Sequence, residues 1–508
     1  MRFIVALIGG AVSAFAFQPF GIAPLMILAF GLLCGLIERA HSLRGAMLTG
    51  WGFGLGQFCV GLNWIATAFT YQATMPAWLG WVAVVLLSFY LAVYPMLAAA
   101  LAWRTGRRKP LALVFALAGG WAACEYLRAG IFTGFAWNPV GVTLVDTPLR
   151  LSSGLVGTYG LSAMVVLLGG GLWIALRNWR EGVRPIALVA VTGVLGFVLL
   201  GAGASQTRLA TPLVRIVQPN IGQAERWSPE LVQAQIARLL NLSGAPEGQP
   251  RLLLWPESAV TTPIEDDRAG TSAAIAQTRQ AVTQALGPND LLVAGSEGLA
   301  STDGLRVTSA RNSSFVLAPG GRLLGRYDKA HLVPYGEYLP MRPILSAIGL
   351  SRLAPGDVDF DAGPGPRTVE LPGFGKMGLQ ICYEIIFSGE VVDRAHRPDF
   401  IFNPSNDAWF GAWGPPQHLA QARLRAAEEG LGVIRSTPTG ISAVVDAEGR
   451  LLASLPWREP GQIEAHIPPA RAPTPFARMG NWLPMLFAFA LVLVALWLAR
   501  PQRVRARP

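Results

Sequence analysis

Three side chains in this sequence, Glu257, Lys329 and Cys382, have the chemical types that covalent catalysis by a thiol requires. A free thiol has a pKa of about 8.5, so at neutral pH it needs a base or a cation beside it to act as a nucleophile. A carboxylate can take the proton, and an ammonium can stabilise an oxyanion. Because no histidine follows a familiar cysteine-protease pattern, Glu257 and Lys329 are the candidate partners of Cys382.

Glu257 and Cys382 each follow a run that has the features of a buried strand. The run Leu252–Trp255 is followed by Pro256, which cannot donate to a sheet ladder, so Glu257 falls in the loop at the carboxyl end of the strand. The run Gly378–Ile381 passes directly into Cys382, as in a nucleophile on a sharp turn after a strand. Open α/β sheets build their sites at these ends. A surface glutamate and an inert core cysteine are the alternative interpretations.

Lys329 stands out because lysine is rare in this chain. Lysine and arginine together number 41, and only three of these are lysines. Lys329 lies in a dense polar motif at 328–337, Asp-Lys-Ala-His-Leu-Val-Pro-Tyr-Gly-Glu. A compact ammonium suits a site that needs a point charge rather than a planar fork of donors. A solvated surface lysine is the alternative interpretation.

The segment from 212 to 470 has the pattern of a layered α/β domain. Strand-like runs alternate with helical periodicity at Pro229–Leu242 and Gln417–Gly430, which favours layered α/β structure over a β-sandwich. Polar residues at 403–410 again follow an apolar strand directly. Besides the two strands above, the predicted strands are Leu213–Gln218, Leu291–Ala294, Ser314–Leu317 and Phe400–Phe402.

The rest of the chain has the composition of an integral membrane protein. Of 508 residues, 52% are hydrophobic and 14% charged, whereas soluble domains usually have about 25% charged residues. Most of the eight apolar runs reach the ~20 residues needed to cross the hydrocarbon core. The first run also resembles a signal peptide, but the many runs after it favour a retained helix. The runs are 3–17, 21–37, 45–69, 78–102, 110–132, 153–176, 185–204 and 481–498.

The net charge of +10 is concentrated in loops next to the apolar runs. Every second loop is basic, as at 104–109 and 177–184, which places both termini in the cytoplasm and the α/β segment on the opposite side. This pattern is not a basic stripe with interleaved aromatics, so we predict no nucleic-acid partner. The predicted parts are 1–205 with seven transmembrane helices, 212–470 with the catalytic residues, 478–500 with the last transmembrane helix, and a basic tail at 501–508.

The other cysteines and the membrane charges suggest no cofactor. Cys34, Cys59 and Cys124 lie in apolar runs without a metal-ligand spacing, so we predict buried thiols, no disulfide and no metal. Glu125 and Arg128, three residues apart near the end of the fifth run, either pair with each other or contact a lipid headgroup.

In combination, the polar motifs resemble the nitrilase, or carbon-nitrogen hydrolase, superfamily, in which Glu, Lys and Cys occur in this order at the ends of separate strands. The motifs are Trp-Pro-Glu-Ser at 255–258, the motif at 328–337, and Cys-Tyr-Glu at 382–384. Several apolar runs, a nitrilase-like segment and one last run are together similar to the apolipoprotein N-acyltransferase family, as is Phe-Gln-Pro-Phe at 17–20. The resemblance implies an extracytoplasmic αββα sandwich beside about eight transmembrane helices.

The resemblance also implies a two-step acyl transfer in the bacterial inner membrane. Glu257 takes the proton of Cys382, the thiolate accepts an acyl chain from a phospholipid, and the α-amino group of a diacylglyceryl apolipoprotein then removes it. Lys329 stabilises the oxyanion in both steps. The enzyme is expected to be a monomer without a cofactor. The resemblance further assigns supporting or substrate-binding roles to Glu337, which fixes the lysine, to Tyr383 and Glu384 beside the nucleophile, and to Trp137 and Trp227.

Two other interpretations of the sequence stay open. A membrane-tethered hydrolase of amides or nitriles would use the same three residues with water as the acceptor, but one apolar anchor would be enough for it. A transporter or scaffold with an inactive external domain would not need an intact set of Glu257, Lys329 and Cys382.

Overall fold

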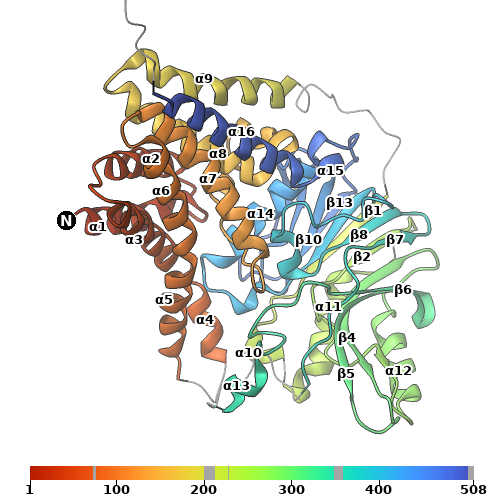
Figure 1. Ribbon diagram of the computed structural model, residues 1–508. Coiled ribbons are helices and arrows are strands. Elements are labelled where there is room, and N and C mark those ends of the chain that lie inside the picture. The colour runs from red at the N-terminus through yellow and green to blue at the C-terminus, as the bar shows by residue number, and fades with distance from the viewer. Residues whose placement is uncertain (72–75, 199–211, 227, 247, 348–357, 502–508) are drawn as a thin grey trace, which may run out of the picture. The chain divides into compact units, whose positions relative to one another are not determined.

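The chain divides into two compact units in the computed structural model (Figure 1). The first unit consists of Met1–Ile65, Leu79–Gly203 and Thr474–Pro508, and the second of Ala66–Trp78 and Ala204–Pro473. Outside the described residues lie Trp227, nearly all of the predicted tail, and the predicted boundary between 205 and 212 up to residue 211. The structure describes residues 1–71, 76–198, 212–226, 228–246, 248–347 and 358–501.

The second unit contains two β-sheets. The first sheet has the strand order β13-β1-β2-β4-β5-β6, with β3 paired to β4, and the second has the order β12-β11-β10-β9-β8-β7. The pairs β1–β2, β2–β4, β8–β9 and β9–β10 are parallel. The strands are β1 (Leu213–Gln218), β2 (Arg251–Leu254), β3 (Glu265–Asp266), β4 (Leu291–Ala300), β5 (Ser309–Ala318), β6 (Arg322–Asp328), β7 (Thr368–Leu371), β8 (Gly375–Leu379), β9 (Phe400–Pro404), β10 (Gly432–Ser436), β11 (Ala443–Val445), β12 (Leu451–Ser454) and β13 (Gly461–His466).

Alternation along the strands builds the layers of this unit. Leu252 and Leu254 of β2 share a core with residues of the second sheet, such as Phe400. Leu253 points to the other face, where it packs with Leu239 of α11, since successive side chains of a strand face opposite ways. Helix α14 packs on β10 of the second sheet. The layered α/β prediction is confirmed. The helices are α10 (Gln223–Arg226), α11 (Val232–Ser243), α12 (Ser272–Val282), α13 (Arg342–Ala347) and α14 (Gly414–Glu429).

The first unit is a bundle of helices, and each predicted apolar run overlaps at least one of them. The fourth run is divided between two helices, and the seventh begins earlier than predicted, at Trp179. The helices are α1 (Arg2–Ser13), α2 (Ala23–Glu38), α3 (Leu43–Gly61), α5 (Leu79–Leu91), α6 (Val93–Gly106), α7 (Pro110–Gly130), α8 (Ser153–Ala175), α9 (Trp179–Gly196), α15 (Pro475–Met479) and α16 (Trp482–Ala499). Of α4 (Ile65–Ala68), only Ile65 belongs to this unit, and the rest belongs to the second unit.

Four helical stretches in the described part of the chain are long and apolar enough to cross a membrane. They are Leu79–Gly106, Pro110–Gly130, Pro148–Ala175 and Trp482–Ala499. The apolar helices at Arg2–Ala16 and Ala23–Glu38 are shorter. A helical region with apolar spans is therefore present as predicted, while the number of eight crossings stays a prediction.

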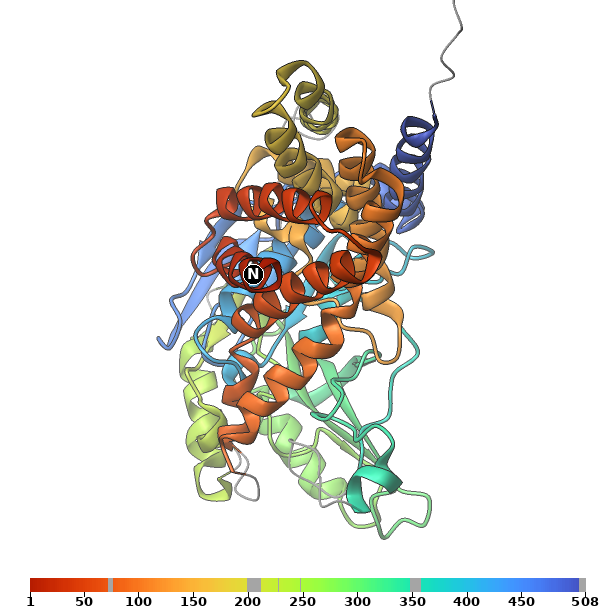
Figure 2. The ribbon, with the colours of Figure 1, turned by 60° about the vertical axis from the view of Figure 1, so that its left-hand side comes forward.

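Glycines bring α1 and α3 into close contact. The N-terminal helices, red in Figure 2, lie side by side, and α1 packs on α3. A Cβ atom on Gly10 of α1 would lie 1.9 Å from the carbonyl oxygen of Phe53, and one on Gly56 of α3 would lie 2.0 Å from that of Leu7. Small residues of this kind allow the backbones of membrane helices to approach each other.

We expect Gly56→Ala to destabilise the first unit, because the added methyl group meets backbone that cannot move away. Overpacking of this kind costs about 1–3 kcal/mol. Thermal unfolding of the full-length protein in detergent measures the effect. Gly130→Ala is the matched control, since a Cβ there meets nothing within 4 Å. Equal unfolding temperatures for the two variants would contradict the proposed close packing.

Candidate active site

Cys382 lies on a sharp turn at the end of β8, where it begins the short 3-10 helix Cys382–Ile386. Its φ is 52°, in the left-handed region, which costs a residue with a Cβ atom about 1–2 kcal/mol. The residue is 6% exposed. A strained conformation persists only where the surrounding structure imposes it, and such residues are frequent at active sites. The predicted position of the thiol after a strand is therefore the observed one.

Glu257 lies in the loop that follows β2, and this loop is held closely against β4. The backbone N–H of Trp255 donates to Val293 at 3.0 Å, and that of Val260 donates to Gly295 at 3.0 Å. A Cβ atom on Gly295 would lie 2.3 Å from the backbone nitrogen of Ser258. Only glycine at 295 allows this approach, which fixes the position of the Glu257 carboxylate.

Lys329 directly follows β6, and its ammonium is buried between two carboxylates. Its Nζ lies 3.0 Å from Oε1 of Glu337 and 3.4 Å from Oε1 of Glu257. Burial by itself lowers the pKa of Lys329, but the charges of Glu337 and Glu257 outweigh burial and raise this pKa above its ordinary value. The side chain is therefore a permanent cation.

Asn312, in the middle of β5, joins the two carboxylates on either side of the lysine. Its side-chain Nδ2 donates to Oε1 of Glu257 at 2.7 Å and to Oε1 of Glu337 at 2.8 Å. The carbonyl oxygen of Asn312 accepts from the backbone N–H of Lys329 at 2.9 Å. Sequence reasoning missed this residue. A sequence signal for it does exist. Residues 311–314 are polar and interrupt the apolar pattern of the strand, and Asn312 is the side-chain amide among them.

The charges around Cys382 decide how its thiol can be activated. Burial and the charge of Glu257 raise the pKa of the Cys382 thiol, while Lys329 acts in the opposite direction. The resting sulfur is therefore protonated and needs a base at the moment of attack. Glu257 offers its second oxygen, Oε2, to which no donor in the described part of the chain hydrogen-bonds.

Glu337 and Glu384 hold loops in place through hydrogen bonds to backbone N–H groups. The second oxygen of Glu337 accepts from the backbone N–H of Val333 at 2.8 Å. The Glu384 carboxylate accepts from the backbone N–H groups of Ile381 and Ala330 at 2.6 and 2.7 Å, and it thereby joins the loop after β8 to the loop after β6. Burial raises the pKa of Glu384 to about 7, although these N–H groups lower it.

The other predicted residues lie as follows. Tyr383 contacts the rings of His331 and Phe387, at centroid distances of 5.7 and 5.2 Å. Trp227 is outside the described residues. Trp137 belongs to the first unit, where it is fully buried against Trp64, 4.4 Å between ring centroids. The predicted substrate contacts of these aromatic residues stay predictions.

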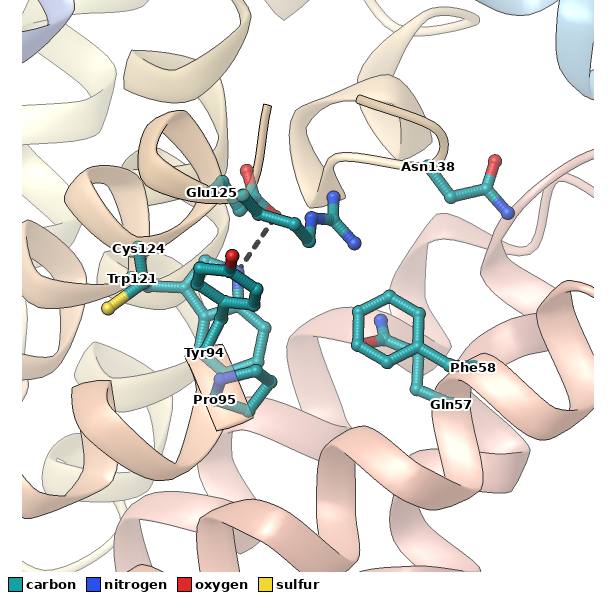
Figure 3. Close-up of a pocket in the computed structure, with 9 residues that line it drawn as sticks. Gln57, Phe58, Tyr94, Pro95, Trp121, Cys124, Glu125 and Asn138 are labelled. Atoms are coloured by element: carbon teal, nitrogen blue, oxygen red, sulfur yellow. Dashed lines mark hydrogen bonds between the residues drawn. The ribbon is translucent and has the colours of Figure 1, made fainter. Parts of the chain in front are cut away.

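Glu125 lies beside a small cavity within the first unit (Figure 3). Its carboxylate accepts from Nε1 of Trp121 at 2.9 Å and from the backbone N–H of Val140 at 2.8 Å. Arg128 also lines the cavity, with its guanidinium 5.0 Å from the ring centroid of Phe58. The cavity volume of about 10 Å³ is roughly that needed for one water molecule. These contacts favour a structural role for the two charges over a headgroup site.

Comparisons with known proteins cover almost the whole chain. Residues 9–171 match the family described as apolipoprotein N-acyltransferase N-terminal domain, and residues 213–474 match carbon-nitrogen hydrolase. Three similar proteins are each named apolipoprotein N-acyltransferase. The protein from Rhodopseudomonas palustris is 33% identical over 98% of this chain and 95% of its own. The one from Bradyrhizobium diazoefficiens is 35% identical over 100% and 96%, and the one from Caulobacter vibrioides 34% over 97% and 93%.

We expect Asn312→Ala to destabilise the second unit, because Glu257 and Glu337 would then repel each other with only the lysine between them. Hydrogen bonds to charged groups contribute about 1.5–3 kcal/mol each. Chemical unfolding of the full-length protein, followed by fluorescence, measures the loss. Asn241→Ala, on the exposed face of α11, should change little. A stability loss at 312 no larger than at 241 would refute the bridging role of the amide.

Proposed function

Because this chain belongs to the apolipoprotein N-acyltransferase family, we propose that it transfers a fatty acyl chain from a phospholipid to the α-amino group of the N-terminal diacylglyceryl-cysteine of an apolipoprotein. The chain is an acyltransferase, and the hydrolase domain at 213–474 fits a thioester mechanism. The observation that carries the proposal is the buried ion cluster of Lys329 with Glu257 and Glu337. The charges of Glu257 and Lys329 also reach the Cys382 thiol, where they shift its pKa in opposite directions.

In the first step, Oε2 of Glu257 takes the proton of the Cys382 thiol while the sulfur attacks an acyl ester carbonyl of the phospholipid. The oxyanion that forms is stabilised by the ammonium of Lys329. The tetrahedral intermediate expels the glycerol oxygen, which takes the proton back from Glu257 and leaves as a lysophospholipid. The acyl chain is then a thioester on Cys382, and no proton has been gained or lost.

In the second step, the α-amino group of the apolipoprotein attacks the thioester carbonyl. Glu257 takes a proton from the amine, and Lys329 again stabilises the oxyanion. The sulfur leaves and recovers the proton from Glu257, so that an amide is released and the thiol is restored. The same base serves both half-reactions because its second oxygen alternates between protonated and ionised.

We assign Glu337 to positioning and not to proton transfer. Its two oxygens accept from Asn312, Lys329 and the backbone N–H of Val333. Both of its oxygens are therefore occupied by hydrogen-bond donors. Glu257 differs because its Oε2 has no hydrogen-bond donor among the described residues. This contrast supports Glu257 as the base.

The membrane helices have a physical reason in this proposal. Both substrates keep acyl chains in the bilayer, and each buried CH₂ contributes about 0.8 kcal/mol, so extraction of a lipid into water is prohibitive. We infer a bacterial inner-membrane enzyme with seven spans before the catalytic domain and one after it. The basic loops support cytoplasmic termini and a periplasmic catalytic domain. We further infer that the enzyme acts as a monomer.

We expect the purified protein, incubated with a labelled phospholipid and no acceptor, to accumulate one acyl group on the peptide that contains Cys382. Mass spectrometry of that peptide measures the adduct. Lys329→Met should slow acylation about 10²–10³-fold, because one oxyanion donor is lost. Lys376→Met, at an exposed lysine in the same unit, is the matched control.

A diacylglyceryl lipopeptide added afterwards should remove the acyl group and form an amide. If wild-type protein instead releases free fatty acid and no amide, the chain is a hydrolase. If no acyl group is found on Cys382, the thioester mechanism is wrong.

We expect a cysteine at Thr302 to react with a membrane-impermeant maleimide added to spheroplasts, and a cysteine at Arg104 to react only after lysis. Both positions are exposed within their units, and the predicted topology puts them on opposite sides. The parent for both variants has its four native cysteines replaced by alanine. Equal labelling of the two positions in intact spheroplasts would contradict this topology.

A further inference from the structure

Behind Cys382 lies a buried polar network that the two steps above do not use. It consists of Ser405, Asp407, His418 and Arg435, and none of these residues is exposed. Buried polar groups are costly unless they are fully paired. A network of this size directly beside a nucleophile therefore calls for a role.

The sheet topology brings these residues to the nucleophile. Strands β8, β9 and β10 are parallel neighbours, so their carboxyl ends lie at one edge of the second sheet. Cys382 follows β8, Ser405 and Asp407 follow β9, and Arg435 lies near the end of β10. His418 comes from α14, which packs on the turn that Cys382 begins.

One end of the network holds the backbone of Cys382. Nε2 of His418 lies 3.1 Å from the Cys382 carbonyl oxygen, so this ring nitrogen carries the proton. The side-chain Nδ2 of Asn403 donates to the same oxygen at 3.4 Å and to the carbonyl of Gln380 at 2.6 Å. These donors fix the peptide unit that follows a residue with φ of 52°.

Asp407 is the charged centre of the network. Its Oδ1 accepts from Oγ of Ser405 at 2.8 Å, and its Oδ2 accepts from Nη2 of Arg435 at 2.5 Å. The same Nη2 lies 3.0 Å from Nδ1 of His418, which can accept from it because the ring proton is on Nε2. Burial raises the pKa of Asp407, but the charge of Arg435, together with the hydrogen bond from Ser405, outweighs burial and lowers the value to about 2. The carboxylate is therefore an acceptor at every physiological pH.

The other end of the network reaches the sulfur. The Ser405 hydroxyl donates to Asp407 at 2.8 Å and stands at the end of β9, beside the strand end that carries Cys382. From there the hydroxyl lowers the pKa of the Cys382 thiol. A hydroxyl has a single proton. While the thiol is protonated, its S–H can donate to Oγ and the hydroxyl can donate to Asp407. Once the thiol proton has left, the hydroxyl can turn to the thiolate, and Asp407 keeps Arg435 as its partner.

We propose that His418 and Ser405 are positioning residues for the nucleophile, with Ser405 held by Asp407 and His418 held by Arg435, which is itself paired with Asp407. His418 keeps Cys382 in its left-handed conformation, and Ser405 stabilises the ionised sulfur. The inference rests on the proposed role of Cys382 as the nucleophile. The charges that act on this sulfur are those of Glu257, Lys329, Asp407 and, more weakly, Arg226. A substitution at Ser405 changes none of these charges, so a change in the pKa of the thiol can be attributed to the lost hydroxyl.

The first test compares single-turnover acylation of Cys382 by phosphatidylethanolamine in the full-length protein. His418→Phe should lower the maximal rate about 10²-fold, the typical cost of a misplacement of about 1 Å at a reacting group. The half-saturating lipid concentration should stay constant, because no lipid contact is removed. His418→Gln, whose amide can donate to the Cys382 carbonyl, should recover most of the rate.

His396→Phe, at an exposed histidine of the same unit, is the matched control and should acylate like the wild type. A wild-type rate in His418→Phe would overturn the inference. So would a rate in His418→Gln as low as in His418→Phe, since packing of the ring rather than its donor would then be responsible.

The second test uses the small change Ser405→Ala and needs no lipid. In a protein with Cys34, Cys59 and Cys124 replaced by alanine, alkylation by iodoacetamide reports on Cys382 alone. The pH profile of the alkylation rate should move upward by about one pH unit in Ser405→Ala, because the thiolate loses a hydrogen-bond donor. Ser301→Ala, outside the network, should leave the profile unchanged.

An unchanged profile in Ser405→Ala would overturn the role of the hydroxyl. Because the second test requires no acyl donor, its result separates the two proposals. If the parent protein takes no acyl group from phospholipid but Ser405→Ala still shifts the alkylation profile, the proposed function fails and the positioning of the thiol stands.

Discussion

The buried ammonium of Lys329 is the interaction on which the second unit depends. Its charge keeps Glu257 and Glu337 together, with Asn312 as their shared donor. Removal of one partner from a buried pair costs about 3–5 kcal/mol, because the other charge is left uncompensated. The three side chains come from the loops after β2 and β6, so these loops must be fixed before the cluster can exist. The close approach at Gly295 and the Glu384 carboxylate fix them.

Cys382 is held from two sides, and the two sides differ in kind. On one side, Glu257 and Lys329 supply charge and a proton acceptor. On the other side, His418 and Asn403 fix the carbonyl group of a strained residue. Strain of this kind must be balanced by surrounding contacts, and here the contacts come from β9 and α14. The parallel order of the second sheet makes this possible, because it gathers the ends of β8 and β9 at one edge.

The sequence predicts the layers and the three chemical residues because their signals are local. Glu257 and Cys382 follow apolar runs, and Lys329 belongs to a residue type that is rare in this chain. Asn312 has only a weak local signal, the polar interruption at 311–314, and its role depends on strand register. His418 has no local signal, since it lies on a helix and is 36 residues from Cys382 in the chain. The predicted strand at Ser314–Leu317 began too late, because the polar residues before it face a site instead of a core. β5 begins at Ser309.

Because lysine is rare in this protein, the reactivity of individual lysines can report on local opening of the folded state. Amine-directed reagents find three lysine side chains in the chain. The side chain of Lys376 is 52% exposed, whereas that of Lys329 is 1% exposed. Lys329 can be modified only during local opening, when the strand ends separate. Lys329 and Lys376 share one unit. The ratio of their modification rates therefore measures how often solvent reaches the buried centre of that unit.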